Sequence, residues 1–210
     1  MRSVTASPQA LEEALRVLAA GGVVAHATET CYGLACDLTN PQAVTKLFAI
    51  KNRPQDQPVS GLFASIATAK KYVEWNTKAE ELASKHLPGP LTLILPMNEA
   101  AREKLFIVPI PNPQSLIRGI GIRISSHPLA MELVRRFGKP LSTTSANVHG
   151  RPNPYSVQEI EQQFASTNVQ PDLILDSGTL PPTPPSTIIN LSSAGQTRTH
   201  RQGDLSVEDR

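Results

Sequence analysis

Small polar side chains gather in one short segment, 142–147, of the stretch KPLSTTSANVHG. The segment carries four hydroxyl groups and one amide, which can bond phosphate oxygens or a carbonyl group without titrating. Ser142, Thr144 and Asn147 are spaced so that alternate strand positions, followed by a loop, would face one side. No Gly-x-Ser-x-Gly motif accompanies them, which argues against a hydrolase. The segment indicates a ligand-binding loop or, alternatively, a strand whose polar residues cap the next turn.

A basic pair, Lys51 and Arg53, follows a predicted helix in the stretch KNRPQDQP. Cations at a helix C-terminus are favoured by the helix dipole, and this explains the pair without any ligand. Alternatively, the compact ammonium and the planar guanidinium grip a polyphosphate. The chain has no Gly-x-x-x-x-Gly-Lys-Ser/Thr motif, so such a site would not be a P-loop.

Polar residues also interrupt two predicted strands. In HATETCYGLACD, Thr28 and Thr30 offer hydroxyl groups and Glu29 offers an acceptor. Gly33 allows the backbone to approach a ligand or to turn sharply, although an ordinary polar strand end accounts for these residues equally well. In GIGIRIS, Arg123 is the sole charge. If Arg123 faces solvent it needs no explanation, but if it faces a cleft it should bind a carboxylate or a phosphate, because an unpaired buried arginine is costly.

Helices and strands alternate along the chain and must position these residues. Capping signals and apolar stripes predict helices that begin at Ser7-Pro8, Asn40-Pro41 and His127-Pro128, and helices over 65–74, 77–86 and 156–165. Apolar and β-branched runs predict strands over 22–28, 91–96, 119–125, 140–146, 173–176 and 186–191. The order predicts a single α/β domain over residues 1–210 with a mixed sheet, a core from about 7 to 203 and a flexible tail over 204–210.

The composition limits the function classes. Of 210 residues, 40% are apolar, which is enough for a core, and the formal net charge is only +2. Any anion-binding surface must therefore come from the local placement of charges. Two cysteines, Cys31 and Cys36, and five scattered histidines show no metal-ligand spacing, so no metal site is expected. Without a signal peptide, or an apolar run near the roughly 18 residues of a membrane helix, we expect a soluble cytoplasmic protein.

Six motifs occur in the order and approximate spacing of one known family: HATETCYGL, KNRP, PGPLT, GIRISSHP, PLSTTSAN and PSTIIN. On these motifs the chain, from about Leu11 to Gly203, resembles the TsaC/YrdC family of threonylcarbamoyl-AMP synthases in its short form. Each motif alone is weak. The six in order are specific, and TETCYGL together with STTSAN is the most specific pair.

The resemblance implies a YrdC-like open, twisted mixed sheet flanked by helices, with a positive concave cleft. It also implies the condensation of L-threonine, bicarbonate and ATP, with Mg²⁺ bridging the triphosphate, into threonylcarbamoyl-AMP and pyrophosphate. A downstream tRNA-modifying protein complex would use the product to modify adenosine 37 of tRNA. Positioning and charge neutralisation would carry most of the rate, so Lys51 and Arg53 are expected to act without a perturbed titration.

The resemblance also assigns site residues by motif position. The catalytic set is Lys51, Arg53 and Ser142. The ATP-binding set is Lys51, Arg53, Thr144, Ser145, Asn147 and Arg201. The threonine-binding set is Thr28, Thr30, Tyr32, Arg123 and Ser186, with Arg123 on the threonine carboxylate.

Some residues depart from the family pattern. Ala27 and Ser125 stand where a proline is common in the family. Leu62 lies near the place of a histidine in long-form members, so no histidine is assigned to threonine binding on that side of the site. One alternative function is a non-catalytic RNA-binding or ribosome-maturation factor on the same fold, although STTSAN, KNR and the low net charge argue against it. A carbamoyl-adenylate module of the hydrogenase-maturation kind would have zinc-finger-like cysteines, which this sequence lacks. A small-molecule binding domain without catalysis is the third alternative.

Overall fold

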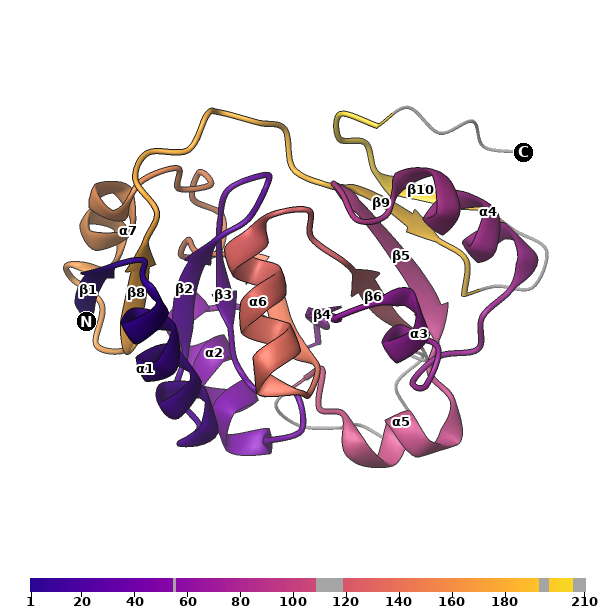
Figure 1. Cartoon of the computed structure of the whole chain (residues 1–210), viewed down its shortest axis with the longest axis horizontal. Helices are drawn as coiled ribbons and strands as arrows, with labels where there is room; N and C mark the ends of the chain where they lie inside the picture. The colour runs from indigo at the N-terminus through magenta and orange to yellow at the C-terminus, as the bar shows by residue number, and fades with distance from the viewer. Residues whose placement is uncertain (55, 109–118, 193–196, 206–210) are drawn as a thin grey trace.

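The computed structural model describes residues 1–54, 56–108, 119–192 and 197–205 (Figure 1). These residues form a ten-stranded mixed sheet in the order β1-β8-β2-β3-β7-β4-β6-β5-β9-β10, flanked by helices. The predicted α/β class with an open mixed sheet is therefore confirmed. The strands are β1 (Arg2–Thr5), β2 (Val24–Ala27), β3 (Tyr32–Ala35), β4 (Ser60–Leu62), β5 (Leu91–Pro96), β6 (Gly119–Arg123), β7 (Leu141–Ser145), β8 (Leu173–Asp176), β9 (Thr187–Asn190) and β10 (Arg198–Arg201). The helices are α1 (Pro8–Ala19), α2 (Pro41–Lys51), α3 (Ile66–Ala69), α4 (Thr77–His86), α5 (Glu99–Lys104), α6 (Pro128–Phe137) and α7 (Val157–Phe164).

The sheet has two halves that meet at β7. The first half contains β1, β8, β2 and β3, and the second contains β4, β6, β5, β9 and β10. Strand β7 runs antiparallel to β3 on one side and to β4 on the other, so it is the joint between the halves. Helices α1 and α6 lie side by side and contribute to one core cluster (Figure 1), whereas α2, α4 and α7 contribute to the other.

Local signals explain where the main helices begin. The Ser7 hydroxyl accepts a hydrogen bond from the Ala10 N–H (3.1 Å) at the start of α1, and the Asn40 amide oxygen caps α2 in the same way. Asn52 caps the C-terminus of helix α2, and its positive φ of 48° is a left-handed conformation that asparagine tolerates. Lys51 is the last residue of the helix, and Arg53 follows this turn.

Several elements differ from the prediction. The helix predicted over 65–74 spans only Ile66–Ala69, because Val73 forms a bridge with Met97 and the Glu74 N–H donates to Pro96 O (2.9 Å). Strands β1, β3, β4 and β10 and helix α5 were not predicted. The polar segment after Ser192 includes β10, which pairs antiparallel with β9. Residues 206–210 of the predicted tail lie outside the described residues.

In the part of the chain that the structure describes, none of the helices combines the length and the apolar character needed to cross a bilayer.

Candidate functional site

A cavity of about 640 Å³ lies over the sheet where its two halves meet. Seven neighbouring strands, from β3 to β10 in the sheet order, contribute to its wall, together with the end of α2 and the turn after β2. Every predicted site residue lines this cavity except Ser142 and Tyr32. The structure therefore brings together motifs that are far apart in the sequence. The predicted residues in the lining are Thr28, Thr30, Lys51, Arg53, Arg123, Thr144, Ser145, Asn147, Ser186 and Arg201.

Small residues keep the floor of the cavity open. Along β6, alternation places Gly119, Gly121 and Arg123 on the cavity side, and isoleucines on the opposite side pack in the core. A Cβ atom at Gly121 would lie 2.3 Å from the Ser60 hydroxyl oxygen, so only glycine fits there without a shift of the neighbouring strand. Arg123 is the large cavity-facing side chain of this strand, which selects the cleft-facing alternative for this residue.

Lys51 ties the end of α2 to β7 and the loop after it. Its ammonium donates to Ser145 O (2.6 Å), Asn147 O (3.0 Å) and Asn147 Oδ1 (2.8 Å). The Ser145 hydroxyl donates to the same Asn147 Oδ1 (2.7 Å), so the three side chains form one network. All of the acceptors around Lys51 are neutral, and the residue is only 2% exposed.

Burial changes the acidity of this basic pair. Burial and, to a lesser extent, the nearby charge of Arg53 together lower the pKa of Lys51 to about 7. Burial also lowers the pKa of Arg53 below its ordinary value. The expectation of an unperturbed titration was therefore wrong, because Lys51 has no counter-ion among the described residues to offset the loss of hydration.

Arg53 is fixed by its own loop. Its Nε donates to Gln57 O and its Nη2 donates to Pro58 O, both at 3.0 Å. The guanidinium carbon lies 5.9 Å from the centre of the Phe48 ring. These contacts hold the side chain at the cavity wall while it remains partly exposed.

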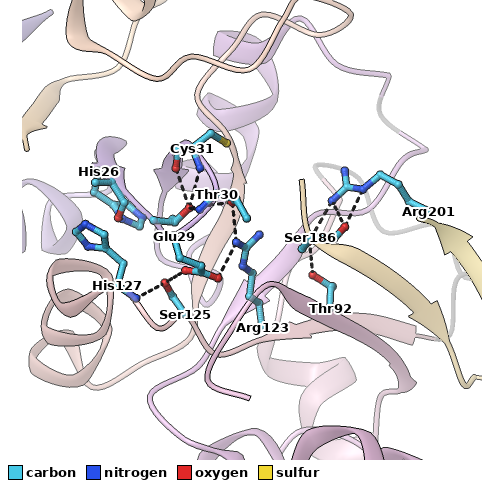
Figure 2. Close-up of polar contacts among 12 residues, drawn as sticks. His26, Glu29, Thr30, Cys31, Thr92, Arg123, Ser125, His127, Ser186 and Arg201 are labelled. Atoms are coloured by element: carbon cyan, nitrogen blue, oxygen red, sulfur yellow. Dashed lines mark hydrogen bonds and ion pairs between the residues drawn. The ribbon is translucent and has the colours of Figure 1, made fainter. Parts of the chain in front are cut away.

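The turn between β2 and β3 holds Arg123 (Figure 2). The Thr28 hydroxyl accepts hydrogen bonds from the N–H groups of Thr30 (3.2 Å) and Cys31 (3.3 Å) and donates to Cys31 O (2.7 Å). The two central residues of the turn are Glu29 and Thr30, and both accept from Arg123 Nη2, at 2.9 and 2.8 Å. The predicted threonine-binding residues Thr30 and Arg123 are therefore in direct contact.

The carboxylate of Glu29 bridges the side chains of Arg123 and Ser125. One carboxylate oxygen accepts from Arg123, and the other accepts a short hydrogen bond from the Ser125 hydroxyl. Burial by itself raises the pKa of Glu29, but the Arg123 charge and the Ser125 hydroxyl outweigh it, so the pKa lies below its ordinary value. Neither Glu29 nor Ser125 was among the predicted site residues, because their partner lies far away in the sequence.

Two histidines lie behind this ion pair (Figure 2). His26 is fully buried, and burial lowers its pKa to about 4. Burial also lowers the pKa of His127. His26 Nε2 and His127 Nδ1 have no hydrogen-bond partner among the described residues. Both rings are therefore neutral near pH 7 and leave Arg123 as the counter-ion of Glu29.

Ser186 and Arg201 form a second polar cluster on the wall from β5, β9 and β10 (Figure 2). Arg201 donates from Nε and Nη2 to Ser186 O (3.0 and 2.9 Å) and from Nη2 to the Ser186 hydroxyl (3.0 Å). The same hydroxyl lies 2.9 Å from Thr92 Oγ1. Thr92 was not among the predicted site residues, although it belongs to the PGPLT motif.

Ser142 and Tyr32 lie away from the cavity. The Ser142 hydroxyl is fully buried, donates to Leu34 O (3.0 Å) and accepts from Cys36 N (2.8 Å), so it braces β7 against β3. The Tyr32 hydroxyl donates to Gly178 O (2.8 Å) and accepts from Ser177 N (2.9 Å). Their polar groups are already used inside the protein. The spacing argument that grouped Ser142 with Asn147 does not hold, because Thr143 lines the cavity in its place.

The charged side chains of the lining are mostly cations. Among the described residues they comprise one carboxylate, Asp56, and four basic side chains: Lys51, Arg53, Arg123 and Arg201. Cations that converge on one concave surface favour an anionic ligand. Among the described residues, no three or more His, Cys, Asp and Glu side chains are grouped so that they could hold a metal ion.

Comparisons with known proteins agree with this geometry. The model of the Sua5/YciO/YrdC family, described as telomere recombination, matches residues 16–203. A threonylcarbamoyl-AMP synthase of Vibrio parahaemolyticus is 34% identical over 156 residues, which make up 73% of this chain and 80% of that protein. The fold is similar to that of P. abyssi Sua5 complexed with L-threonine, with a TM-score of 0.83 and 28% identity over 98% of this chain and 58% of the longer Sua5 chain. E. coli YciO shares the fold over 99% of this chain and 98% of its own, with a TM-score of 0.83 and 22% identity.

Proposed function

Because this chain belongs to the Sua5/YciO/YrdC family, we propose that it is an L-threonylcarbamoyladenylate synthase. It would condense L-threonine, bicarbonate and ATP into threonylcarbamoyl-AMP and pyrophosphate. The observation that carries the proposal is one cavity in which the guanidinium of Arg123 and the ammonium of Lys51 converge with neutral hydroxyl and amide groups. Relatives that bear the synthase name, and the Sua5 complex with L-threonine, support it.

Threonine would bind at the wall formed by the β2–β3 turn and β6. Its carboxylate would meet Arg123, and the hydroxyl of Thr30, which already contacts Arg123, would stand beside it. Thr28 holds the turn in shape through its three backbone contacts, so its role would be to place Thr30. Ser186, the residue before β9, would close the site from that side, where Thr92 and Arg201 hold its hydroxyl.

ATP would bind at the wall formed by the end of α2 and by β7. Lys51 and Arg53 would meet the phosphates, and Thr144, Ser145 and Asn147 would line the region between the nucleotide and the carbamate. Arg201 would add a further positive charge from β10. Mg²⁺ would enter as part of the MgATP substrate, bound mainly by the triphosphate, because Asp56 is the single carboxylate among the described residues of the lining.

The reaction needs positioning more than acid–base chemistry. The deprotonated amine of threonine attacks the carbon of bicarbonate, and loss of water leaves a carbamate. A carbamate oxygen then attacks the α-phosphorus of ATP, and the bond to pyrophosphate breaks. Fixed cations along the wall would neutralise the charge that develops on the leaving pyrophosphate.

The destination of the product belongs to the same proposal. Threonylcarbamoyl-AMP would leave the cavity and serve a separate protein complex that modifies adenosine 37 of tRNA in the cytoplasm. Direct contact of this chain with RNA would use the basic wall of the cavity. The low formal net charge of +2 makes small anionic substrates the better match for this wall.

The test is pyrophosphate release from MgATP by the purified chain, with threonine and bicarbonate each present or omitted. Release that requires both co-substrates supports the synthase. Release that needs neither indicates a plain ATP hydrolase. Binding of ATP without release under any combination would favour the non-catalytic RNA-binding or ribosome-maturation alternative.

A further inference from the structure

A buried ion pair supports the cavity wall on which threonine would bind. Arg123 lines the cavity, whereas its partner Glu29 does not. The side chains are only 10% and 14% exposed. Glu29 therefore acts on whatever binds in the cavity through Arg123 and not by touching it.

The backbone around Glu29 aims its carboxylate at Arg123. Glu29 is a central residue of the turn that joins β2 to β3, and the Thr28 N–H closes this turn on Cys31 O (3.1 Å). The Thr28 hydroxyl adds three more contacts inside the turn. A turn held by that many hydrogen bonds gives its central side chains little freedom, so Glu29 and Thr30 point at Arg123 together (Figure 2).

The other oxygen of Glu29 is anchored to the start of α6. The Ser125 hydroxyl donates a hydrogen bond to Glu29 and accepts one from the His127 N–H (3.0 Å). His127 precedes α6 and gives that helix no side-chain cap. Glu29 is thereby fixed from both sides, by β6 through Arg123 and by α6 through Ser125.

The Arg123 guanidinium depends on Glu29 for its charge balance and its orientation. Arg123 Nε is buried without a hydrogen-bond partner among the described residues. Without Glu29, the guanidinium would be a buried charge with no counter-ion, and only Thr30 would orient its Nη2. Such a side chain would reorient toward any available water or acceptor. The guanidinium would then no longer be held in a fixed orientation for hydrogen bonding to a ligand carboxylate.

We propose that Glu29 is a positioning residue for amino-acid binding: it holds the Arg123 guanidinium in the one orientation that receives the carboxylate of the amino acid. This inference rests on the proposed function for the identity of that amino acid. It concerns a residue outside the cavity, and it makes the β2–β3 turn part of the recognition machinery.

The experiment compares Glu29→Ala and Glu29→Gln with the native chain. In Glu29→Ala the KM for threonine rises about tenfold while the KM for ATP stays within about twofold, because only the guanidinium loses its geometry. Glu29→Gln keeps an oxygen acceptor for Arg123 and returns the KM for threonine to within about threefold of the native value. An unchanged KM for threonine in Glu29→Ala, or an equal rise for both substrates, overturns the proposal.

A double-variant cycle separates positioning from a general structural role. When Arg123 is already Ala, the further change Glu29→Ala should leave the KM for threonine unaltered, because Glu29 no longer has anything to position. Effects that simply multiply would overturn the proposal. Asp172→Ala is the matched control, since Asp172 accepts from Val23 N (2.7 Å) and Lys46 Nζ (2.6 Å) away from the cavity, and its loss should leave the KM for threonine unchanged.

Two further measurements keep the inference independent of folding and of the proposed function. If Glu29→Ala does not fold, Ser125→Ala keeps the ion pair but frees one oxygen of the carboxylate, and it should raise the KM for threonine about threefold. An unchanged value would overturn the proposal. Titration calorimetry with L-threonine gives the binding constant without catalysis. Loss of threonine binding in Glu29→Ala, in a chain that releases no pyrophosphate, would sink the synthase and keep the positioning role. Normal pyrophosphate release by Glu29→Ala with an unchanged KM for threonine would keep the synthase and overturn the positioning role.

Discussion

The β2–β3 turn with β6 and the end of α2 with β7 both hold a buried cation, but with different partners. Arg123 is paired with the carboxylate of Glu29, whereas Lys51 is held by three neutral oxygen atoms of Ser145 and Asn147. The pKa of Glu29 lies below its ordinary value, so this carboxylate stays ionised at neutral pH. The pKa of Lys51 is lowered to about 7, so its charge responds to pH in the neutral range.

This difference matches the two anions that the cavity would receive. A guanidinium whose charge is already offset can bind a single carboxylate and release it again. A buried ammonium that has no carboxylate partner in the protein is stabilised most by a bound polyanion, because the phosphates supply the missing negative charge. The comparison predicts that the α2 wall controls ATP and that the β6 wall controls the amino acid.

Loss of the unpaired ammonium should give the largest effect. We expect Lys51→Met to lower the rate of pyrophosphate release by at least about 100-fold, since a fixed cation next to the leaving pyrophosphate is removed. The fold should survive, because methionine fills a buried site of similar length without a desolvation cost. Pyrophosphate release and thermal melting measure the two quantities. Lys46→Met changes a lysine of the same helix that pairs with Asp172 outside the cavity, and a similar loss there would refute the assignment.

A change to the paired cation should act on threonine alone. Arg123→Lys keeps a charge for Glu29 but loses the planar fork, and we expect the KM for threonine to rise about 30-fold. The KM for ATP should stay within about twofold, because the α2 wall is intact. Steady-state kinetics with each substrate varied in turn measure both values. Arg135→Lys, in an exposed arginine–glutamate pair on α6, is the matched control. A rise of both KM values would break the division between the walls.

The pH dependence should also separate the walls. An anion next to Lys51 favours the ammonium form, so ATP binding is strongest below the pKa of about 7 and weakens as pH rises through it. For one titrating group, the dissociation constant of ATP should increase about tenfold between pH 6 and pH 8 through this group. Calorimetry of the native chain and of Lys51→Arg isolates the effect, since arginine stays charged. Threonine binding should be flat over this range, and an equal slope for both ligands would contradict the comparison.

The fold was predicted best where local chemistry decides it. Serine and asparagine caps gave the starts of α1 and α2, because a cap needs only neighbouring residues. Strand β10, with the sequence RTHR, has no apolar alternation and is a strand because it pairs with β9. Propensity and pattern carry no information about such a partner.

The site followed the same division. The motifs singled out Arg123, but its place in an alternating strand left the solvent-facing and cleft-facing alternatives open, and only the folded sheet decides between them. The motifs did not identify Glu29 as its partner, because the two residues lie 94 positions apart and only the folded sheet joins them. Ser142 failed for the related reason that β7 turns it toward β3 and not toward the cavity.

The smallest effect on activity should come from the hydroxyl that braces the joint between the walls. We expect Ser142→Ala to change the rate of pyrophosphate release by less than about threefold and to cost about 1–2 kcal/mol of unfolding free energy, because the buried Cys36 N–H loses its acceptor. Ser145→Ala, which alters the network around Lys51, should show the opposite balance, with a larger loss of rate and a smaller loss of stability. Denaturant unfolding and pyrophosphate release distinguish the two. A rate loss in Ser142→Ala as large as that in Ser145→Ala would mean that the joint itself, and not its two walls, controls the reaction.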